Sequence, residues 1–282
     1  MAVRPLGGYP ARVTAPVVDT FAGIGRHTTF YGRVLLHLPS AVVRYWRHVL
    51  KLIGEISFGS ASLLAGGGTI GVVFAMSAVA STQIGLEGYR GLDLIGLSPM
   101  TGLMSALVNT REIAPVVASI ALAAKVGTGF TAQLGAMRIS DEIDALETMA
   151  VPSLPFLVST RMAAAFISVI PLYLVGLFAS YAATSLAVVH IKGQSSGTYD
   201  YYFQLLLTPT DVLYSLLKAV IFAVIITLVH CGYGYYATGG PEGVGRAAGR
   251  ALRTSIVTVT IVDVLLTIGF WGLRPTLPGL GA

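Results

Sequence analysis

Two long stretches of this chain carry no formal charge, and they constrain its fold more than any other feature. Residues 56–86 and 162–191 comprise 31 and 30 such residues, most of them apolar. A bilayer core about 30 Å thick is crossed by roughly 20 apolar residues in a helix. Composition agrees, because 54% of the residues are hydrophobic and only 11% are charged, against about 25% charged in a typical soluble domain. We therefore expect an all-α membrane protein that crosses the bilayer several times.

Five membrane spans are expected, at about 58–84, 97–124, 162–190, 212–236 and 254–273. The second contains Arg111-Glu112 followed by Pro115, which predicts a kinked or broken helix whose charged pair faces protein or water. We expect Arg111 and Glu112 to neutralise each other, the alternative being contact with a lipid headgroup. Lys218 and Asp263 lie inside the last two spans. Each is either a functional group or half of an ion pair between those spans.

The distribution of Lys and Arg predicts the orientation of the spans. With a cytoplasmic N-terminus, thirteen basic residues lie on the inner side, and only Arg90, Lys192 and Arg274 lie outside. Such a bias marks the cytoplasmic loops. The N-terminus is therefore expected inside and the C-terminus outside. The net charge of +5 and the pI near 9.4 are then a signal of orientation, and no nucleic-acid partner is expected.

The chain before the first span divides into two parts. Residues 1–16 contain three prolines and Gly7-Gly8, so we expect them to be flexible. Residues 17–56 mix apolar and basic residues with an aromatic pair, Tyr45-Trp46, as in a helix that lies in the headgroup plane. The alternative is an ordinary cytoplasmic helix packed on the protein. Residues 57–282 are expected to form one membrane domain.

Several kinds of chemistry have no support in the sequence. No glycine-rich loop ends in Gly-Lys-Ser or Gly-Lys-Thr, so the chain is not expected to hydrolyse ATP by itself. The five histidines and the single Cys231 show no metal-ligand spacing, and no hydroxyl residue stands in a recognisable triad. We therefore expect neither an enzyme nor a metal or cofactor site in this chain.

An acidic segment at residues 139–150 stands out in this basic protein. Four of the chain's thirteen acidic residues, Asp141, Glu142, Asp144 and Glu147, fall within seven positions, 141–147. Their spacing predicts a short amphipathic helix with Ser140 as its N-cap and Pro152 just beyond its end. The negative charge and amphipathic pattern of this helix fit two roles. It is either a solvated loop helix or a helix that docks on a basic or polar groove of a partner.

Several motifs of this chain resemble those of one family of transporters. They are Glu87-Gly88-Tyr89, Arg111-Glu112-Ile113-Ala114-Pro115, the small-residue run 125–137, the acidic signature 141–147 and Pro152. Together they resemble the MlaE/YrbE family of ABC permeases. Two departures are Lys125 and Gln133, where the family has Arg and Glu. The chain looks most like a YrbE subunit, read as the B-type, of an Mce lipid transport system.

The resemblance implies a function and a set of partners. The chain would be the permease of an ATP-driven Mce-type transporter in the bacterial plasma (inner) membrane, moving fatty acids, phospholipids or sterols across the cell envelope. ATP and Mg would be held by partner ABC ATPase subunits, a second YrbE permease (a paralogue or a second copy) would pair with this one, and Mce substrate-binding proteins would lie outside. Coupling to the ATPase would run through the 139–150 helix, and specifically through Asp141, Glu142, Ile143, Asp144, Ala145, Leu146 and Glu147.

The lipid cavity is expected to be lined by apolar side chains of the first and fifth spans, for which Val72, Phe74, Met76 and Phe270 are the candidates. Two other functions stay open. One is a secondary transporter driven by an ion gradient, with Glu112 and Asp263 as proton carriers. The other is a structural membrane subunit without a transport cavity.

Overall fold

The computed structural model describes residue 25 and residues 28–58 and 68–272. In these ranges it contains helices and no strand, which confirms the all-α prediction. The named helices are α2 (Leu38–Arg44), α3 (Trp46–Phe58), α4 (Gly68–Asp93), η2 (Ser98–Met100), α5 (Thr101–Val108), η3 (Asn109–Ile113), α6 (Ala114–Ala121), η4 (Leu122–Gly127), α7 (Thr128–Ile139), α8 (Glu142–Thr148), η5 (Leu154–Ser159), α9 (Thr160–Leu186), η6 (Ala187–Ile191), α10 (Ser196–Leu206), α11 (Pro209–Tyr235) and α12 (Gly240–Trp271).

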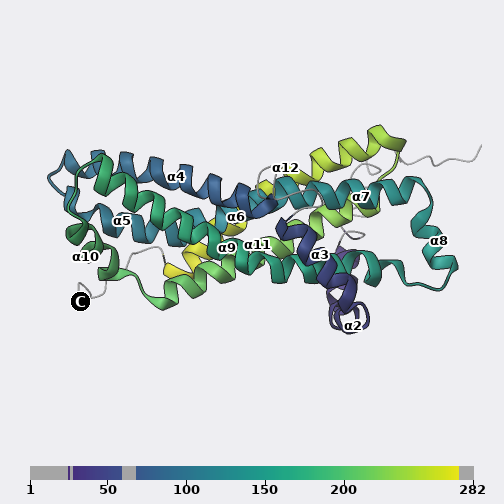
Figure 1. Cartoon of the computed structure of the whole chain (residues 1–282). Coiled ribbons are helices and arrows are strands. Elements are labelled where there is room, and N and C mark those ends of the chain that lie inside the picture. Colours follow the sequence, from purple (N-terminus) through teal and green to yellow (C-terminus); the bar gives the residue numbers. More distant parts are fainter. Residues whose placement is uncertain (1–24, 26–27, 59–67, 273–282) are drawn as a thin grey trace, which may run out of the picture.

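Five continuous helices are long and apolar enough to cross a membrane, as predicted. They are Gly68–Asp93, Ser98–Ile139, Leu154–Ile191, Pro209–Tyr235 and Gly240–Trp271. They run along one long axis, with α10 at one end of the bundle and α8 at the other (Figure 1). Residues 59–67, where the first span was expected to begin, lie outside the described residues.

The helices extend well beyond the predicted spans. The second passes through the Arg111-Glu112-Pro115 region unbroken and runs on to Ile139. Of the kinked or broken helix that was predicted, the break does not occur, and the helix has a π-helical segment at Asn109–Ile113 instead. The fifth begins at Gly240, which places Arg246 and its neighbours on the helix rather than in a connection. A run of apolar residues in the sequence marks only the part of a helix that faces lipid or the core. The helix itself is longer, because its backbone hydrogen bonds continue into polar turns.

Close contact between α4 and α9 depends on small residues. A β-carbon at Gly176 of α9 would lie 3.0 Å from Val73 and 3.1 Å from Ser77 of α4, and one at Gly85 of α4 would lie 2.7 Å from Thr184. Without a hydrophobic driving force in lipid, helices associate through such close packing. The helices α4 and α9 are therefore closely packed along this contact.

The N-terminal segment crosses the bundle rather than following its axis (Figure 1). The single helix expected over 17–56 is divided in the described part, with interruptions at His37 and Tyr45. One face of α3 buries Val49, Leu52 and Ile56, mainly against α9. The opposite side leaves apolar side chains exposed together with basic ones. The flexibility expected of residues 1–16 concerns a part of the chain outside the described residues.

Packing of α7 against α11 yields a test of the fold. A β-carbon at Gly234 would lie 2.9 Å from the Thr131 carbonyl oxygen and 3.0 Å from its Cα, where the backbone cannot give way. Gly234→Ala should destabilise the protein by about 1–3 kcal/mol, measured as a lower midpoint of thermal unfolding in detergent. The matched control is Gly245→Ala on α12, where the added carbon meets nothing within 4 Å. Equal midpoints for the two variants would contradict the packing.

Candidate functional site

A buried lysine connects three helices of the bundle. Lys218 of α11 is fully buried, and its Nζ lies 2.7 Å from Asp263 Oδ1 of α12 and 3.3 Å from Glu112 Oε2 of η3. Thr267 of α12 completes the group, because its Oγ1 lies 2.9 Å from Lys218 Nζ and 2.9 Å from Glu112 Oε1. The ion pair between spans four and five, one of the two alternatives for these residues, is therefore present, and Glu112 joins it.

Pro115 explains why Lys218 is buried at this place. Proline has no N–H, so it cannot bond the carbonyl of Arg111, four residues earlier. In the wider π-helical register of η3, the carbonyl of Thr110 loses its donor in the same way. Side chains of α11 replace the missing donor, since Lys218 Nζ donates to the Arg111 carbonyl over 2.8 Å and Ser215 Oγ donates to the Thr110 carbonyl. The helix therefore continues past the proline.

Arg111 and Glu112 do not neutralise each other, so the prediction that they form a pair is wrong. Arg111 Nη2 lies 2.8 Å from Asp211 Oδ1, which also accepts a 2.6 Å hydrogen bond from Trp271 Nε1. Consecutive residues of a helix point about 100° apart, so they do not face each other. Arg111 and Glu112 therefore reach different partners, Asp211 at the start of α11 and Lys218 two turns further on.

The cluster leaves one negative charge without a cationic partner if every group is ionised. Arg111 and Lys218 face three carboxylates, those of Asp211, Glu112 and Asp263. Charges at this depth are costly unless they are paired. The site can therefore hold one proton between Glu112 and Asp263, or accept one cationic group. Those are the two carboxylates that the sequence singled out as candidate proton carriers.

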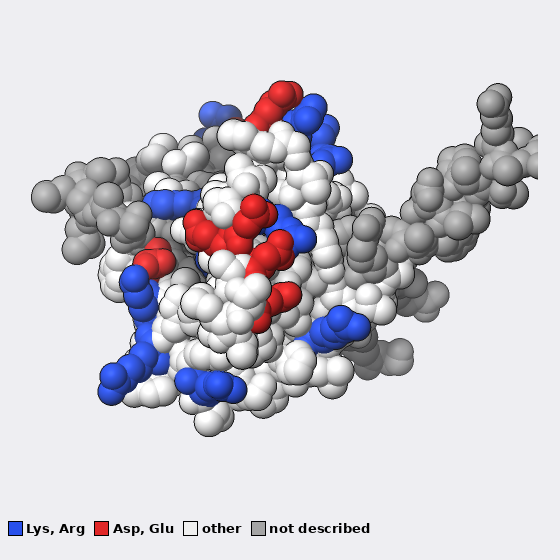
Figure 2. Space-filling model, turned by 90° about the vertical axis from the view of Figure 1, so that its right-hand side faces the viewer, with Lys and Arg blue, Asp and Glu red and all other residues white. Residues whose placement is uncertain are grey.

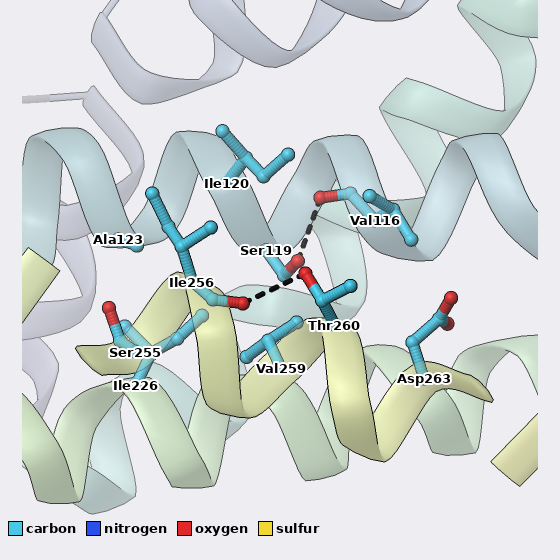
Figure 3. A pocket seen from close by; sticks show the side chains of 10 residues that line it. All are labelled: Val116, Ser119, Ile120, Ala123, Ile226, Ser255, Ile256, Val259, Thr260 and Asp263. Carbon is cyan, nitrogen blue, oxygen red and sulfur yellow. Dashed lines mark hydrogen bonds between the residues drawn. The ribbon is translucent and has the colours of Figure 1, made fainter. Parts of the chain in front are cut away.

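A small pocket of about 80 Å³ opens beside this cluster, between α6, α11 and α12. Figure 3 shows Asp263 at one end of the lining and Ser255 at the other. The hydroxyls of Ser119, Ser255 and Thr260 donate to carbonyls of their own helices, so the lining is mainly apolar. Pockets that enclose a ligand usually measure about 300–1,000 Å³, so this one can hold only part of a lipid.

The four residues predicted for the lipid cavity lie elsewhere on α4 and α12. Val72 packs against the core, while Phe74 and Met76 are exposed on the outside of α4. Phe270 stacks on Tyr214 with ring centroids 4.9 Å apart. None of them lines the 80 Å³ pocket. Their contact with lipid stays a prediction.

The acidic segment forms a helix, α8, at the far end of the bundle from α10. It is shorter than predicted, because Ser140 ends α7 by donating to the Ala136 carbonyl, and Asp141 is the residue that precedes the helix. Ser140 is therefore not the N-cap. Seen end-on, acidic side chains group near the middle of this face and basic ones surround them (Figure 2). The exposed acids of α8 and its flank are Asp141, Glu142, Asp144 and Glu147.

Contacts on the inner side of α8 fix it to the membrane helices. Ile143 is fully buried and Leu146 packs against the main core. Ser153 donates to Glu147 over 2.5 Å and lies 2.8 Å from the Tyr235 hydroxyl of α11. Arg138 of α7 pairs with Asp144 at 2.7 Å. The outer side stays free, with Ala145 exposed and Met149 66% exposed just beyond the helix.

Sequence reasoning missed three members of the membrane site, Asp211, Trp271 and Thr267. Asp211 lies one residue before the predicted fourth span, so it was not counted among the charges inside the spans. A local signal did exist, because Thr208-Pro-Thr-Asp211 has the spacing of a capping box, and the structure contains that box. Trp271 and Thr267 carry no charge, and only the packing of α12 on α11 identifies them.

Removal of the buried cation tests the cluster. Lys218→Met should destabilise the protein by about 3–5 kcal/mol, because it leaves Glu112 and Asp263 buried without a cation. Lys51→Met changes a lysine that is 74% exposed and should have little effect. Thermal unfolding in detergent measures both. Adding Asp263→Asn to Lys218→Met should recover part of the loss, and a further loss in the double variant would contradict the pairing.

Comparison with known proteins places this architecture in a family. The family model described as Permease MlaE matches residues 59–268. A probable ABC transporter permease of Rickettsia bellii is 33% identical over 184 residues, which is 65% of this chain and 71% of that protein. A probable ABC transporter permease of Synechocystis is 27% identical over 84% of this chain and 86% of its own.

A plant protein is also similar. The chloroplastic protein named trigalactosyldiacylglycerol 1, from Arabidopsis thaliana, is 26% identical over 85% of this chain and 66% of its own length. The family match covers the buried charge cluster, the pocket beside it and α8. It also agrees with five helices that are able to cross a membrane. This chain belongs to the MlaE permease family.

Proposed function

We propose that this chain is the membrane permease of an ATP-driven, Mce-type lipid transporter in the bacterial plasma membrane, with its N-terminus inside and its C-terminus outside. A separate ABC ATPase drives it through α8, with ATP and Mg bound to the ATPase. Fatty acids, phospholipids and sterols are the candidate cargo classes, and Mce proteins are the expected partners outside. Family membership and relatives described as ABC transporter permeases support the general class.

The geometry of α8 is the observation that carries the proposal. Its inner side buries Ile143, pairs Asp144 with Arg138 of α7, and holds Glu147 to Ser153 at the start of the third span and to Tyr235 of α11. Its outer side presents Glu142 and Met149 to the surroundings. A displacement of α8 is therefore transmitted to the second, third and fourth spans at once. A solvated loop helix would have no need of so many anchors.

An apolar face on α12 supports a second permease and a lipid path. Val257, Ile261, Val264 and Ile268, spaced by three or four residues, are each 40–58% exposed, and the 80 Å³ pocket lies beside this helix. A second permease packed on this face would enlarge the pocket into an apolar cavity. One relative is named after a glycolipid, in agreement with a lipid cargo.

An ion-driven transporter is the second candidate function, favoured by the unpaired negative charge near Lys218. In that case Glu112 and Asp263 would carry protons, and an uncoupler would stop transport. The ABC proposal predicts the opposite, transport that survives an uncoupler but stops when the ATPase is inactivated. The two functions are separated by these inhibitors in vesicles containing the whole complex.

Charge reversal on the outer side of α8 tests the coupling. Glu142→Lys combined with Met149→Asp removes the exposed acid and the exposed apolar side chain, and leaves Asp144, Glu147 and Ile143 in place. We expect at least a tenfold fall in lipid transport and in stimulated ATPase activity of the purified complex, which corresponds to about 1.4 kcal/mol or more of lost interaction.

The control for this experiment lies at the same end of the molecule. Glu242→Lys changes an exposed acid on the first turn of α12 and should leave both activities close to wild type. Unfolding midpoints of all variants should match, since no anchor is removed. Full transport with the Glu142 and Met149 changes would rule out α8 as the coupling element.

Cross-linking tests the pairing of permeases. With the buried Cys231 changed to Ala, cysteines placed at Val257, Ile261 and Leu265 should form disulfides with a second copy of the chain or with a paralogous permease made in the same cells. Leu174→Cys on α9, where Leu174 is also exposed, is the control. Equal cross-linking from α9 and α12 would show that this face has no specific partner.

A further inference from the structure

Arg161 is buried without an acidic partner. Its side chain, in α9, is 6% exposed, and no carboxylate of the described residues lies within ion-pair distance. Its Nη1 donates to the Leu157 carbonyl over 2.6 Å, its Nη2 donates to Gln133 Oε1 over 3.2 Å, and its Nε has no hydrogen-bond partner. Buried charges are normally paired, because a lone charge in a low dielectric is costly. The charge of Glu55 favours the charged guanidinium, but its carboxylate lies beyond ion-pair distance of Arg161 and also pairs with Lys51, so Arg161 is balanced only in part.

A pocket lies next to Arg161, on the other side of two residues that it contacts. The guanidinium sits 5.5 Å from the Phe130 ring centroid and bonds Gln133, and both side chains line a pocket of about 210 Å³ between α3, α4 and the second span. Lys125 also lines this pocket, is exposed, and forms no ion pair with a described residue. Lys125 in the lining and Arg161 behind Gln133 and Phe130 therefore place two cations beside one cavity.

Other groups around the pocket neutralise these cations only in part. Glu55 lines it, but its carboxylate lies 3.9 Å from Lys51 at the surface. Burial, and after it the nearby charge of Arg161, hold the pKa of His48 on α3 below its usual value, which favours the neutral imidazole beside this guanidinium. The surroundings of the pocket are positive overall.

The position of the pocket indicates what kind of anion it takes. It lies at the end of α3, the helix that crosses the bundle, and apolar Ile56, Val126 and Phe130 line it beside the charged groups. Its volume suits a headgroup but not acyl chains, which would extend outward along the bundle. Basic pockets between membrane helices are typical binding sites for phospholipid headgroups.

We propose that this pocket binds the phosphate of a phospholipid, held by Lys125 and Arg161, as a structural lipid that is separate from the transported one. Arg161 reaches the phosphate beside Gln133 with donors it does not use internally, and Lys125 approaches from the open side. The bound lipid joins α3 to the second and third spans. The inference requires only that the chain spans a membrane, so it does not rest on lipid transport.

Two substitutions test this site in different ways. Gln133→Glu places a carboxylate next to Arg161, which supplies the missing counter-charge and removes the need for an external one. Gly129→Leu fills the pocket, because a β-carbon at Gly129 meets nothing within 4 Å. Gly91→Leu at the other end of α4 is the control, since it also meets nothing within 4 Å and lies outside the pocket.

The measurement is native mass spectrometry of the purified complex in detergent, followed by titration with dihexanoyl phosphatidic acid. Wild type and Gly91→Leu should retain one more phospholipid per chain than Gln133→Glu and Gly129→Leu. Both pocket variants should bind the short-chain lipid about tenfold more weakly, in line with loss of a charge-assisted hydrogen bond. Gln133→Glu should also unfold at the same or a higher temperature.

The possible results separate the proposal from its rivals. Equal lipid retention in all four proteins would overturn it. Binding of inorganic phosphate as tightly as the short-chain lipid would overturn the assignment to a phospholipid, because the acyl chains would then contribute nothing. Weaker lipid binding accompanied by a lower unfolding temperature in both pocket variants would point to damaged packing and would also overturn it. Failure of transport in any variant has no bearing on these readouts.

Discussion

Pro115 removes a backbone hydrogen-bond donor from the second span, inside a membrane where water cannot replace it. The rest of the structure depends on the neighbouring side chains that supply donors instead. Pro115 cannot bond the carbonyls of the preceding turn, and inside a membrane each unsatisfied carbonyl costs several kcal/mol. Lys218 and Ser215 of the neighbouring helix supply the donors. A lysine used in this way must be neutralised in turn, which accounts for Glu112 and Asp263 at its side. One proline thus requires a three-helix junction.

This junction and α8 are joined by a single helix. From Glu112 to Ile139 the second span rises by about 40 Å at 1.5 Å per residue, without a break. It contains two π-helical segments, η3 and η4, and such segments often mark places where a helix adjusts its register. A displacement of α8 would therefore reach the charge cluster and the adjoining pocket along a continuous backbone. This arrangement supports the proposed coupling.

Much of the fold followed from the sequence, because long apolar helices leave a strong periodic and compositional signal. The five spans and a short acidic helix were predictable, and the pair between Lys218 and Asp263 was one of two alternatives that the sequence offered. The partner of Arg111 was not, since adjacency in sequence suggested Glu112 whereas helical geometry directs the two side chains to different neighbours. Thr267 and Trp271 act through packing and hydrogen bonds that carry no charge signal, and the same is true of Gln133, whose role depends on where Arg161 lies.

The central claim is that α8 is the surface on which an ATPase acts, and photo-cross-linking tests it most directly. A photoreactive amino acid at Ala145, exposed on the outer side of α8, would be activated in cells that make the complete transporter. The account predicts a covalent adduct with an ATP-hydrolysing subunit from this position, and none from the same probe at Gly91 near the opposite end of the bundle. An ATPase that copurifies with the chain but is cross-linked from neither position would contradict it.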